Sequence, residues 1–222
     1  MQKRNDIVLT VISSNEELKW FFNWYLQHNN SLTLPYHNLN HTLEMMQLVI
    51  DIVQKSRDGK YGIVLTDQDM FILLLSAMFH DYNHSGGRHN DSVNTDNAKI
   101  GLKTAIQSRY TWNEDTEKLY NECSKVISAT EYPYKINTLE PKQLILRELD
   151  ILVVLYDDFL TQSVFGLAEE MKWQDFLMNF SKYTKFLLES FENLSLQYSI
   201  DLFDENKDVF LKTIENFISC VR

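Results

Sequence analysis

"DQDMFILLLSAMFHDYNH", residues 67–84, contains the longest apolar run of the chain and ends in a group of polar residues. The apolar part, "MFILLLSAMF", is about half of the roughly 20 residues that a membrane crossing requires. A helix that is apolar on all sides lies inside a protein and is contacted by other helices. We therefore expect a buried central helix over 67–82 that holds the polar group "FHDYNH" rigidly at its end.

The sequence around this segment favours helices as well. Six glycines and three prolines in 222 residues leave few turn signals, and apolar residues recur at helical spacing. This pattern predicts an all-α fold, a compact helical bundle that forms a single domain over residues 1–222. The capping residues Thr66 with Asp69, and Asp204, mark two helix starts. The expected helices span 14–28, 36–56, 67–82, 92–108, 113–130, 138–160, 172–195 and 204–219.

Composition and charge exclude several classes of protein. With 31 acidic and 21 basic residues the net charge is −10, which disfavours stable nucleic-acid binding. Two cysteines, Cys123 and Cys220, are too few for a disulfide framework and indicate a reducing compartment. The N-terminal segment carries no secretory signal pattern. We therefore expect a cytoplasmic protein without membrane association, whose oligomeric state the sequence leaves open.

Four of the six histidines form two pairs with a spacing of four residues. His37 and His41 lie in "PYHNLNH", and His80 and His84 lie in "FHDYNH" beside Asp81. Residues four apart share one face of a helix, so each pair can point into one pocket. A single pair of this spacing is hydrogen-bonded in the core or solvated about as often as it belongs to a functional site. Two pairs with an adjacent aspartate predict a metal site, because imidazole and carboxylate together suit Zn, Fe, Mn or Mg.

These motifs also carry a family resemblance. "YHNLNH" and "FHDYNHSGG" resemble the YHNxxH and HDxxH signatures of the 3',5'-cyclic nucleotide phosphodiesterases, which belong to the HD-domain metal-dependent phosphohydrolase superfamily. Downstream, "VISATEYP" (126–133) is similar to the helix that precedes the last metal ligand, and "LRELDILVV" (146–154) to the segment with a final aspartate. The resemblance covers a motif-bearing core, 36–155, and implies a helical phosphodiesterase-like fold with two divalent metal ions.

The resemblance assigns a role to each matching residue. It gives the first metal ion four protein ligands: His41, His80, Asp81 and Asp150. Asp81 would also reach a second metal ion, whose other positions would be filled by water. His37 would be the general acid, His84 would orient a water or the acid, and Asn38 would support His37.

The final metal ligand has competitors in the sequence. Asp150 is preferred because it stands in "ELDIL" before an apolar run. The carboxylates of Glu148, Asp157 and Asp158 lie nearby, and a surface position for Asp150 is the alternative.

This combination of groups suits the hydrolysis of a phosphodiester. Two divalent ions lower the pKa of a bridging water and neutralise the charge on the phosphoryl oxygens. A protonated histidine assists a poor alkoxide leaving group, typically by about 10²-fold to 10⁴-fold. The resemblance therefore predicts an enzyme, a phosphoric ester hydrolase that converts a 3',5'-cyclic nucleotide into the 5'-monophosphate. Its partner would be a small-molecule phosphoester, most simply a nucleotide.

The chain departs from the family pattern in several places. The loop "HSGGRHND" is one residue longer than usual, and Asn90 would take the place of the family's asparagine. No "ENHH"-like stretch is present, and "NEDTEKLYNE" occupies its region. Glu131 stands where Asp or His is common and either holds a water of the second metal ion or is solvated. Gln174, with Phe176 or Phe180, offers an amide for base recognition, although the spacing differs from the family's and core packing is the alternative for the aromatic residues.

Two other functions remain open. The chain could be an HD-type phosphohydrolase that acts on another nucleotide or phosphoester, such as a nucleoside monophosphate or a cyclic dinucleotide. It could also be a non-catalytic HD fold that binds a nucleotide. The presence of His37 beside a complete ligand set argues against the second possibility, because a binding protein needs no general acid.

Overall fold

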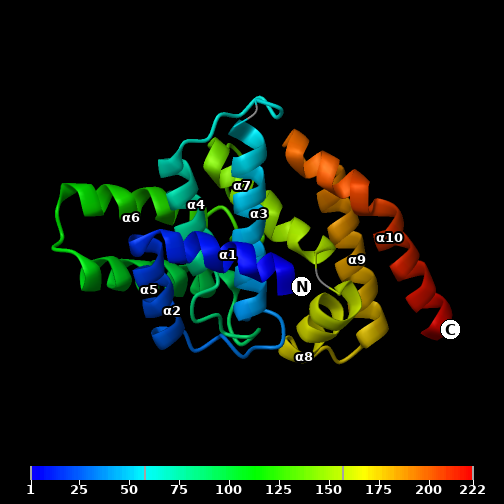
Figure 1. Ribbon diagram of the computed structural model, residues 1–222. Coiled ribbons are helices and arrows are strands. Elements are labelled where there is room, and N and C mark those ends of the chain that lie inside the picture. Colours follow the sequence, from blue (N-terminus) through cyan, green and yellow to red (C-terminus); the bar gives the residue numbers. More distant parts are fainter. Residues whose placement is uncertain (1, 58, 157, 222) are drawn as a thin grey trace.

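The computed structural model describes residues 2–57, 59–156 and 158–221, with side chains from residue 6 onward (Figure 1). The described residues are mostly helical and contain no strand, which confirms the predicted all-α fold. The elements in chain order are α1 (Gln2–Ser14), α2 (Glu16–His28), α3 (Leu39–Arg57), α4 (Asp67–Phe79), α5 (Asp91–Arg109), α6 (Glu114–Ile127), α7 (Pro141–Leu152), the 3-10 turn η1 (Val153–Leu155), the π-helix η2 (Phe159–Gly166), α8 (Leu167–Glu170), α9 (Phe176–Glu192) and α10 (Gln197–Val221).

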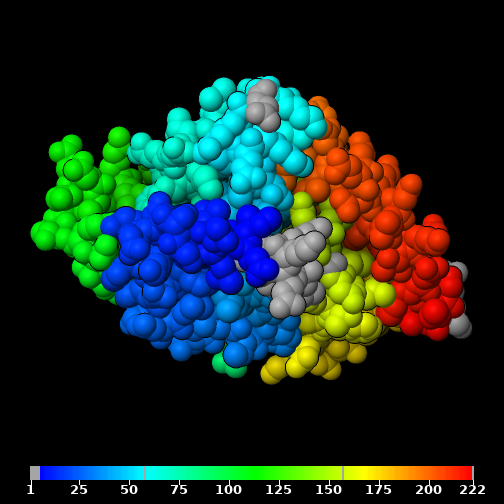
Figure 2. Space-filling model, in the orientation of Figure 1, coloured from blue at the N-terminus to red at the C-terminus, as the bar shows by residue number. Residues whose placement is uncertain are grey.

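Helices α3 and α4 form the centre of the molecule. Every residue of α4 from 72 to 79 is buried, and α4 packs against α2, α3, α5, α6 and α7. This is the central helix that the apolar run predicts. Its start is also as expected, because Thr66 and Asp69 form a capping box in which each side chain bonds the other's backbone N–H. In Figures 1 and 2, α1 lies across α3 at the centre of the view, with α6 on one flank of the molecule and α9 and α10 on the other.

Both motif helices are shorter than predicted at the ends that carry the histidines. Helix α3 begins at Leu39 instead of residue 36, because the Asn38 side-chain oxygen accepts hydrogen bonds from the backbone N–H groups of Asn40 and His41. Helix α4 ends at Phe79 instead of residue 82. The chain then turns, and Asn83 adopts the left-handed conformation with φ of 53°. His37 and His84 consequently lie outside the helices.

The prediction of a single helix over 138–160 is wrong. Helix α7 ends at Leu152, and the path through η1, η2 and α8 bends back by 115°. The Asp158 side chain accepts a hydrogen bond from the Thr161 N–H at the start of η2, which fixes a new helix start. Residue 157 lies outside the described residues. The bend brings α8 alongside the segment before α3, which matters for the site.

The predicted start of the last helix at Asp204 is also wrong, because α10 begins at Gln197. Both Glu148 carboxylate oxygens accept backbone hydrogen bonds, from the N–H groups of Ser195 and Leu196, so α7 supplies the cap for this helix. A long-range cap of this kind leaves no local sequence signal.

Across the described ranges, no single helix combines the length and apolarity of a membrane span. One bent pair, 141–155 with 159–170, meets that criterion when its two parts are taken together.

Candidate active site

The structure divides each histidine pair between two clusters. His41 lies in the first turn of α3 and His37 in the segment before it, whereas His80 caps α4 and His84 follows the turn after it. His41 meets His80, and His37 meets His84. The expectation that each pair shares one helical face is therefore wrong, because a helix end falls inside each pair.

The first cluster, here called the metal cluster, consists of His41, His80, Asp81 and Asp150. The Nε2 atoms of His41 and His80 are 3.2 Å apart. Asp81 Oδ2 lies 3.2 Å from His41 Nε2 and 3.0 Å from His80 Nε2. Asp150 Oδ1 lies 3.5 Å from both nitrogens. A metal ion about 2.1 Å from each ligand would separate neighbouring ligand atoms by about 3.0 to 3.4 Å, so the four atoms have the spacing of a coordination shell.

The hydrogen bonding of the metal cluster also fits a metal ion. His80 Nδ1 donates to the carbonyl oxygen of Ala77 at 2.8 Å, which leaves the Nε2 lone pair free as a ligand. Asp81 Oδ2 and His41 Nδ1 are buried and have no hydrogen-bond partner. A buried carboxylate oxygen without a donor is costly unless a cation is bound to it. The chemistry of these donors therefore matches a divalent ion.

The charges of the metal cluster point the same way. Burial opposes the imidazolium of His41, but the adjacent carboxylates of Asp150 and Asp81 outweigh it and raise the pKa of His41 to about 9. Burial likewise opposes ionisation of Asp150, yet hydrogen bonds from His41 and His80 lower its pKa to about 2. The two carboxylates thus hold protons on the imidazoles at neutral pH. Positive charge is therefore favoured at the position that a metal ion would take.

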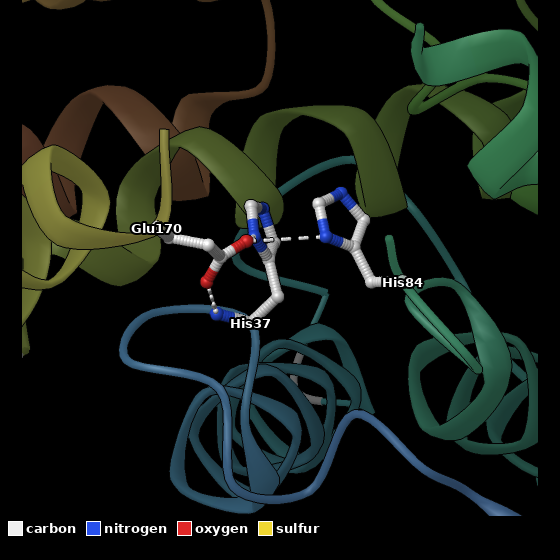
Figure 3. Close-up of side chains that lie close together, drawn as sticks. All are labelled: His37, His84 and Glu170. Atoms are coloured by element: carbon white, nitrogen blue, oxygen red, sulfur yellow. Dashed lines mark hydrogen bonds and ion pairs between the residues drawn. The ribbon is translucent and has the colours of Figure 1, made fainter. Parts of the chain in front are cut away.

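The second cluster, here called the acid–base cluster, consists of His37, His84 and Glu170 (Figure 3). Glu170 Oε1 accepts a hydrogen bond from His37 Nδ1 at 2.5 Å and lies 3.2 Å from His84 Nδ1. Glu170 Oε2 accepts hydrogen bonds from the backbone N–H groups of Tyr36 and His37, each at 3.1 Å. Burial opposes the carboxylate, but the bonds from His37 and His84 hold the pKa of Glu170 well below its usual range.

The two imidazoles of this cluster lie face to face. The ring centroids of His37 and His84 are 3.6 Å apart, and both rings direct Nδ1 toward the same Glu170 oxygen (Figure 3). Asn94 Oδ1 accepts from the Ser85 N–H, so its Nδ2 is the group that donates to His84 Nε2, at 2.8 Å. The backbone N–H of Gly86 donates to His84 Nδ1 at 3.2 Å, and the same nitrogen lies 3.2 Å from Glu170 Oε1.

Glu170 was not among the residues predicted for the site. It lies 133 residues after His37 in the sequence and reaches it through the bend after α7. The approach depends on Gly166, where a Cβ atom would stand 2.7 Å from the carbonyl oxygen of Pro35. The one sequence signal is this glycine inside an otherwise helical segment, which marks a close approach of two backbones.

The other residues considered for the site have various positions. Asn38 braces the turn around His37, because its Nδ2 donates to the carbonyl oxygens of Leu34 and Pro35. Asn90 precedes α5 and lines the cavity described below. Glu131 forms a surface ion pair with Lys135 and does not line that cavity.

Gln174 and the competing carboxylates lie elsewhere. Gln174 is exposed and donates to the carbonyl oxygen of Lys172, so it is not brought to the cavity. Of the competitors for the last ligand, Glu148 caps α10 and Asp158 caps η2, and Asp157 lies outside the described residues. Asp150 is the carboxylate that approaches the histidines.

A cavity of about 680 Å³ opens onto both clusters. Its wall includes His80, Asp81 and Asp150 of the metal cluster and His37 and His84 of the acid–base cluster. The volume lies within the range of small-molecule sites. A small molecule in this cavity can therefore contact residues of both clusters at the same time.

Comparisons with known proteins agree with the motifs. A sequence model of the family described as 3'5'-cyclic nucleotide phosphodiesterase matches residues 36–111. The dual specificity calcium/calmodulin-dependent 3',5'-cyclic nucleotide phosphodiesterase 1C of Mus musculus is 34% identical over 71 residues, which are 32% of this chain and 9% of that protein. The 3',5'-cyclic-AMP phosphodiesterase 4 of Dictyostelium discoideum is 31% identical over 71 residues, 32% of this chain and 6% of that protein.

The matches cover part of each protein. The chain spans less than a tenth of the length of these curated relatives, and no solved structure matches it. The family match includes the four clustered histidines and Asp81, whereas Asp150 and Glu170 lie beyond it. Residues 36–111 are thus similar to the 3'5'-cyclic nucleotide phosphodiesterase family, which confirms the resemblance predicted from the two histidine motifs.

Proposed function

We propose that this chain is a metal-dependent phosphoric ester hydrolase that hydrolyses a 3',5'-cyclic nucleotide to the 5'-monophosphate. The observation that carries the proposal is the separation of four histidines into two clusters on one cavity wall. One cluster offers lone pairs for a cation, and the other holds a proton. The similarity of residues 36–111 to cyclic nucleotide phosphodiesterases supports the choice of substrate.

Two divalent ions are proposed, and Zn, Mg, Mn and Fe all suit the donors. His41, His80, Asp81 and Asp150 would hold the first ion, and Asp81 would share the second, completed by water. Such ions supply a nucleophilic hydroxide at neutral pH and neutralise charge on the phosphoryl group. The Ala77 carbonyl oxygen accepts a hydrogen bond from Nδ1 of His80, which leaves Nε2 as the nitrogen that would bind the ion.

His37 is proposed as the general acid. Its Nδ1 proton is committed to Glu170, so the proton available for donation is on Nε2. Transfer of that proton to the leaving alkoxide oxygen would complete cleavage of the ester bond and leave a neutral His37 still bound to Glu170. The carboxylate stabilises the imidazolium before transfer and fixes the ring's orientation.

His84 is proposed to keep the positive charge on His37. Two imidazolium rings with centroids 3.6 Å apart would repel each other, and a neutral His84 beside His37 avoids this repulsion. Asn94 Nδ2 faces Nε2 of His84 and the Gly86 N–H faces Nδ1, so donors on both ring nitrogens favour its neutral form. His37 is then the charged ring, and its Nε2 proton remains free to act on a substrate.

A substrate panel tests the proposal. Metal-loaded protein would be incubated with 3',5'-cyclic mononucleotides, nucleoside monophosphates, a cyclic dinucleotide and an aryl phosphodiester, in water enriched in oxygen-18. We expect a 5'-monophosphate with one labelled phosphate oxygen from a cyclic mononucleotide. Cleavage of only a cyclic dinucleotide or a nucleoside monophosphate would show that the substrate is not a cyclic mononucleotide. Binding without turnover would identify a nucleotide-binding protein instead.

A further inference from the structure

One face of α9 forms a part of the cavity wall that contains no residue of either cluster. The residues of α9 that line the cavity follow the pattern i, i+3, i+4, i+7, i+8, which places them on the same side of the helix: Asn179, Lys182, Tyr183, Phe186 and Leu187. A substrate whose phosphate lies at the metal cluster would extend toward this face. The predicted amide for base recognition, Gln174, is absent from it.

The aromatic residues of this wall suit a planar ring. Phe186 of α9 contacts Tyr132 across the cavity, with ring centroids 5.1 Å apart and planes at 72°. Tyr183 is another aromatic residue of the α9 face. Ile151 and Val154 add apolar side chains to the cavity wall. Nucleobases of every kind stack on such side chains, so the aromatic residues alone do not select a base.

The polar groups of the same face have a definite hydrogen-bonding character. Asn179 Nδ2 donates to the carbonyl oxygen of Asp175 at 2.8 Å, which leaves its Oδ1 as an acceptor. Lys182 is exposed and makes no hydrogen bond or ion pair with any described residue. Its ammonium group carries three donors and no acceptor. By contrast Lys185, one turn further on, does not line the cavity and lies 3.6 Å from Glu189.

We propose that Lys182 and Asn179 select a nucleotide whose base carries a ring carbonyl beside a ring N–H, as guanine and uracil do. The carbonyl oxygen accepts from Lys182, and the adjacent N–H donates to Asn179 Oδ1. Adenine and cytosine carry an amino group instead of the carbonyl, and this group cannot accept from an ammonium. In these bases the exocyclic group donates and the adjacent ring nitrogen accepts, so donor and acceptor are exchanged. The base has to shift in the cavity to meet both Lys182 and Asn179, and it binds less tightly.

This inference rests on the proposed function, and its test separates the two. Metal-loaded protein would be titrated calorimetrically with 5'-GMP, 5'-UMP, 5'-AMP and 5'-CMP, which are products and are not consumed. We expect 5'-GMP and 5'-UMP to bind roughly tenfold more tightly than 5'-AMP and 5'-CMP, as expected for one charge-assisted base contact. In hydrolysis, kcat/KM for cyclic GMP over cyclic AMP should show the same ratio.

The variants test which residue makes the difference. Lys182→Met should bring the ratio close to one, Lys182→Arg should keep it because donors remain, and Lys185→Met should leave it unchanged. A ratio does not depend on the fraction of folded protein. Cyclic nucleotide hydrolysis with no base preference, or with a preference that Lys182→Met preserves, would overturn this inference and leave the proposed function standing. Absence of both nucleotide binding and hydrolysis would overturn both.

Discussion

The metal cluster and the acid–base cluster are built from the same two histidine motifs, yet they differ in which polar atoms have partners. In the metal cluster, Asp81 Oδ2 and His41 Nδ1 are buried without a hydrogen-bond partner. In the acid–base cluster, Glu170 Oε2 accepts from two backbone N–H groups, and Oε1 faces two imidazole nitrogens. Asp81 Oδ2 has two imidazole nitrogens 3.0 and 3.2 Å away but no hydrogen bond, whereas both oxygens of Glu170 accept hydrogen bonds.

This difference decides where a cation belongs. The ligand atoms of His41, His80 and Asp81 lie within 4.8 Å of one another, and so do those of His37, His84 and Glu170. Proximity alone therefore does not distinguish the clusters. A saturated carboxylate would have to lose hydrogen bonds to accept a metal ion, whereas an unpartnered one gains a ligand. We infer that the first cluster binds metal and the second holds a proton.

The largest effect is expected from Asp150→Ala, which removes one ligand atom from the metal cluster. Metal ions contribute several kcal/mol to such reactions, so we expect kcat/KM to fall by about 10³-fold or more as bound metal is lost. Metal content and steady-state kinetics measure this. Asp158→Ala is the matched control, because it removes a nearby carboxylate that only caps η2. Equal metal loss in both variants would refute the assignment of Asp150.

His37→Ala should break the acid–base cluster alone. We expect kcat for a cyclic nucleotide to fall by about 10²-fold to 10³-fold, because the alkoxide leaves without a proton. An aryl phosphodiester has a leaving group that needs no proton, so its hydrolysis should change only a few-fold. Parallel assays of both substrates measure the difference. An equally large loss with the aryl ester would mean that His37 serves binding or metal coordination instead.

Glu170→Gln should show how much the carboxylate contributes to His37. Groups that orient a catalytic or ligating histidine typically contribute about 10-fold to 100-fold, and we expect a loss of kcat in that range. Unchanged kcat would show that His37 acts without Glu170.

The same variant should change stability in a pH-dependent way. The pKa of Glu170 is below its usual range, so its stabilising contribution is present above pH of about 4.5 and is lost as pH falls further. We expect Glu170→Gln to lower the free energy of unfolding by about 2 kcal/mol at pH 7. Urea denaturation of both proteins at pH 7 and pH 3 should show the difference shrinking at the lower pH.

A smaller effect concerns the competition between protons and metal. The pKa of His41 is raised to about 9 in the metal-free cluster, so a proton must leave before a metal ion binds. Metal affinity should therefore rise with pH up to about 9, by up to about tenfold per unit. Competition with a chelating dye between pH 6 and pH 9 measures it. A flat profile would place the metal ion away from His41.

Much of the central fold follows from the sequence because few arrangements of the helices meet its requirements for burial and capping. The apolar run at 70–79 has to be buried on all sides, and the capping box at Thr66 fixes where its helix starts. The histidines and Asp81 follow from their motifs. The division of each histidine pair between two clusters does not follow from the motifs. It depends on where α3 begins, next to Asn38, and where α4 ends, before Asn83, and a sequence does not fix helix ends to within one or two residues.

Glu170 could not be predicted for a different reason. Its approach to His37 requires the bend after Leu152 and the close contact of Gly166 with Pro35, which arise from tertiary packing. The same holds for the early start of α10, which Glu148 caps from another helix. Long-range contacts of this kind leave at most a single glycine or glutamate as a local sign.

The metal content of two variants tests the division of labour most directly. His41→Ala and His37→Ala would be purified without chelator, and their bound metal would be measured by mass spectrometry beside the wild-type protein. The two histidines lie four residues apart on opposite sides of the start of α3. We expect His41→Ala to lose its metal and His37→Ala to retain the wild-type amount. Loss of metal from His37→Ala, or full retention in His41→Ala, would contradict the separation of the two clusters.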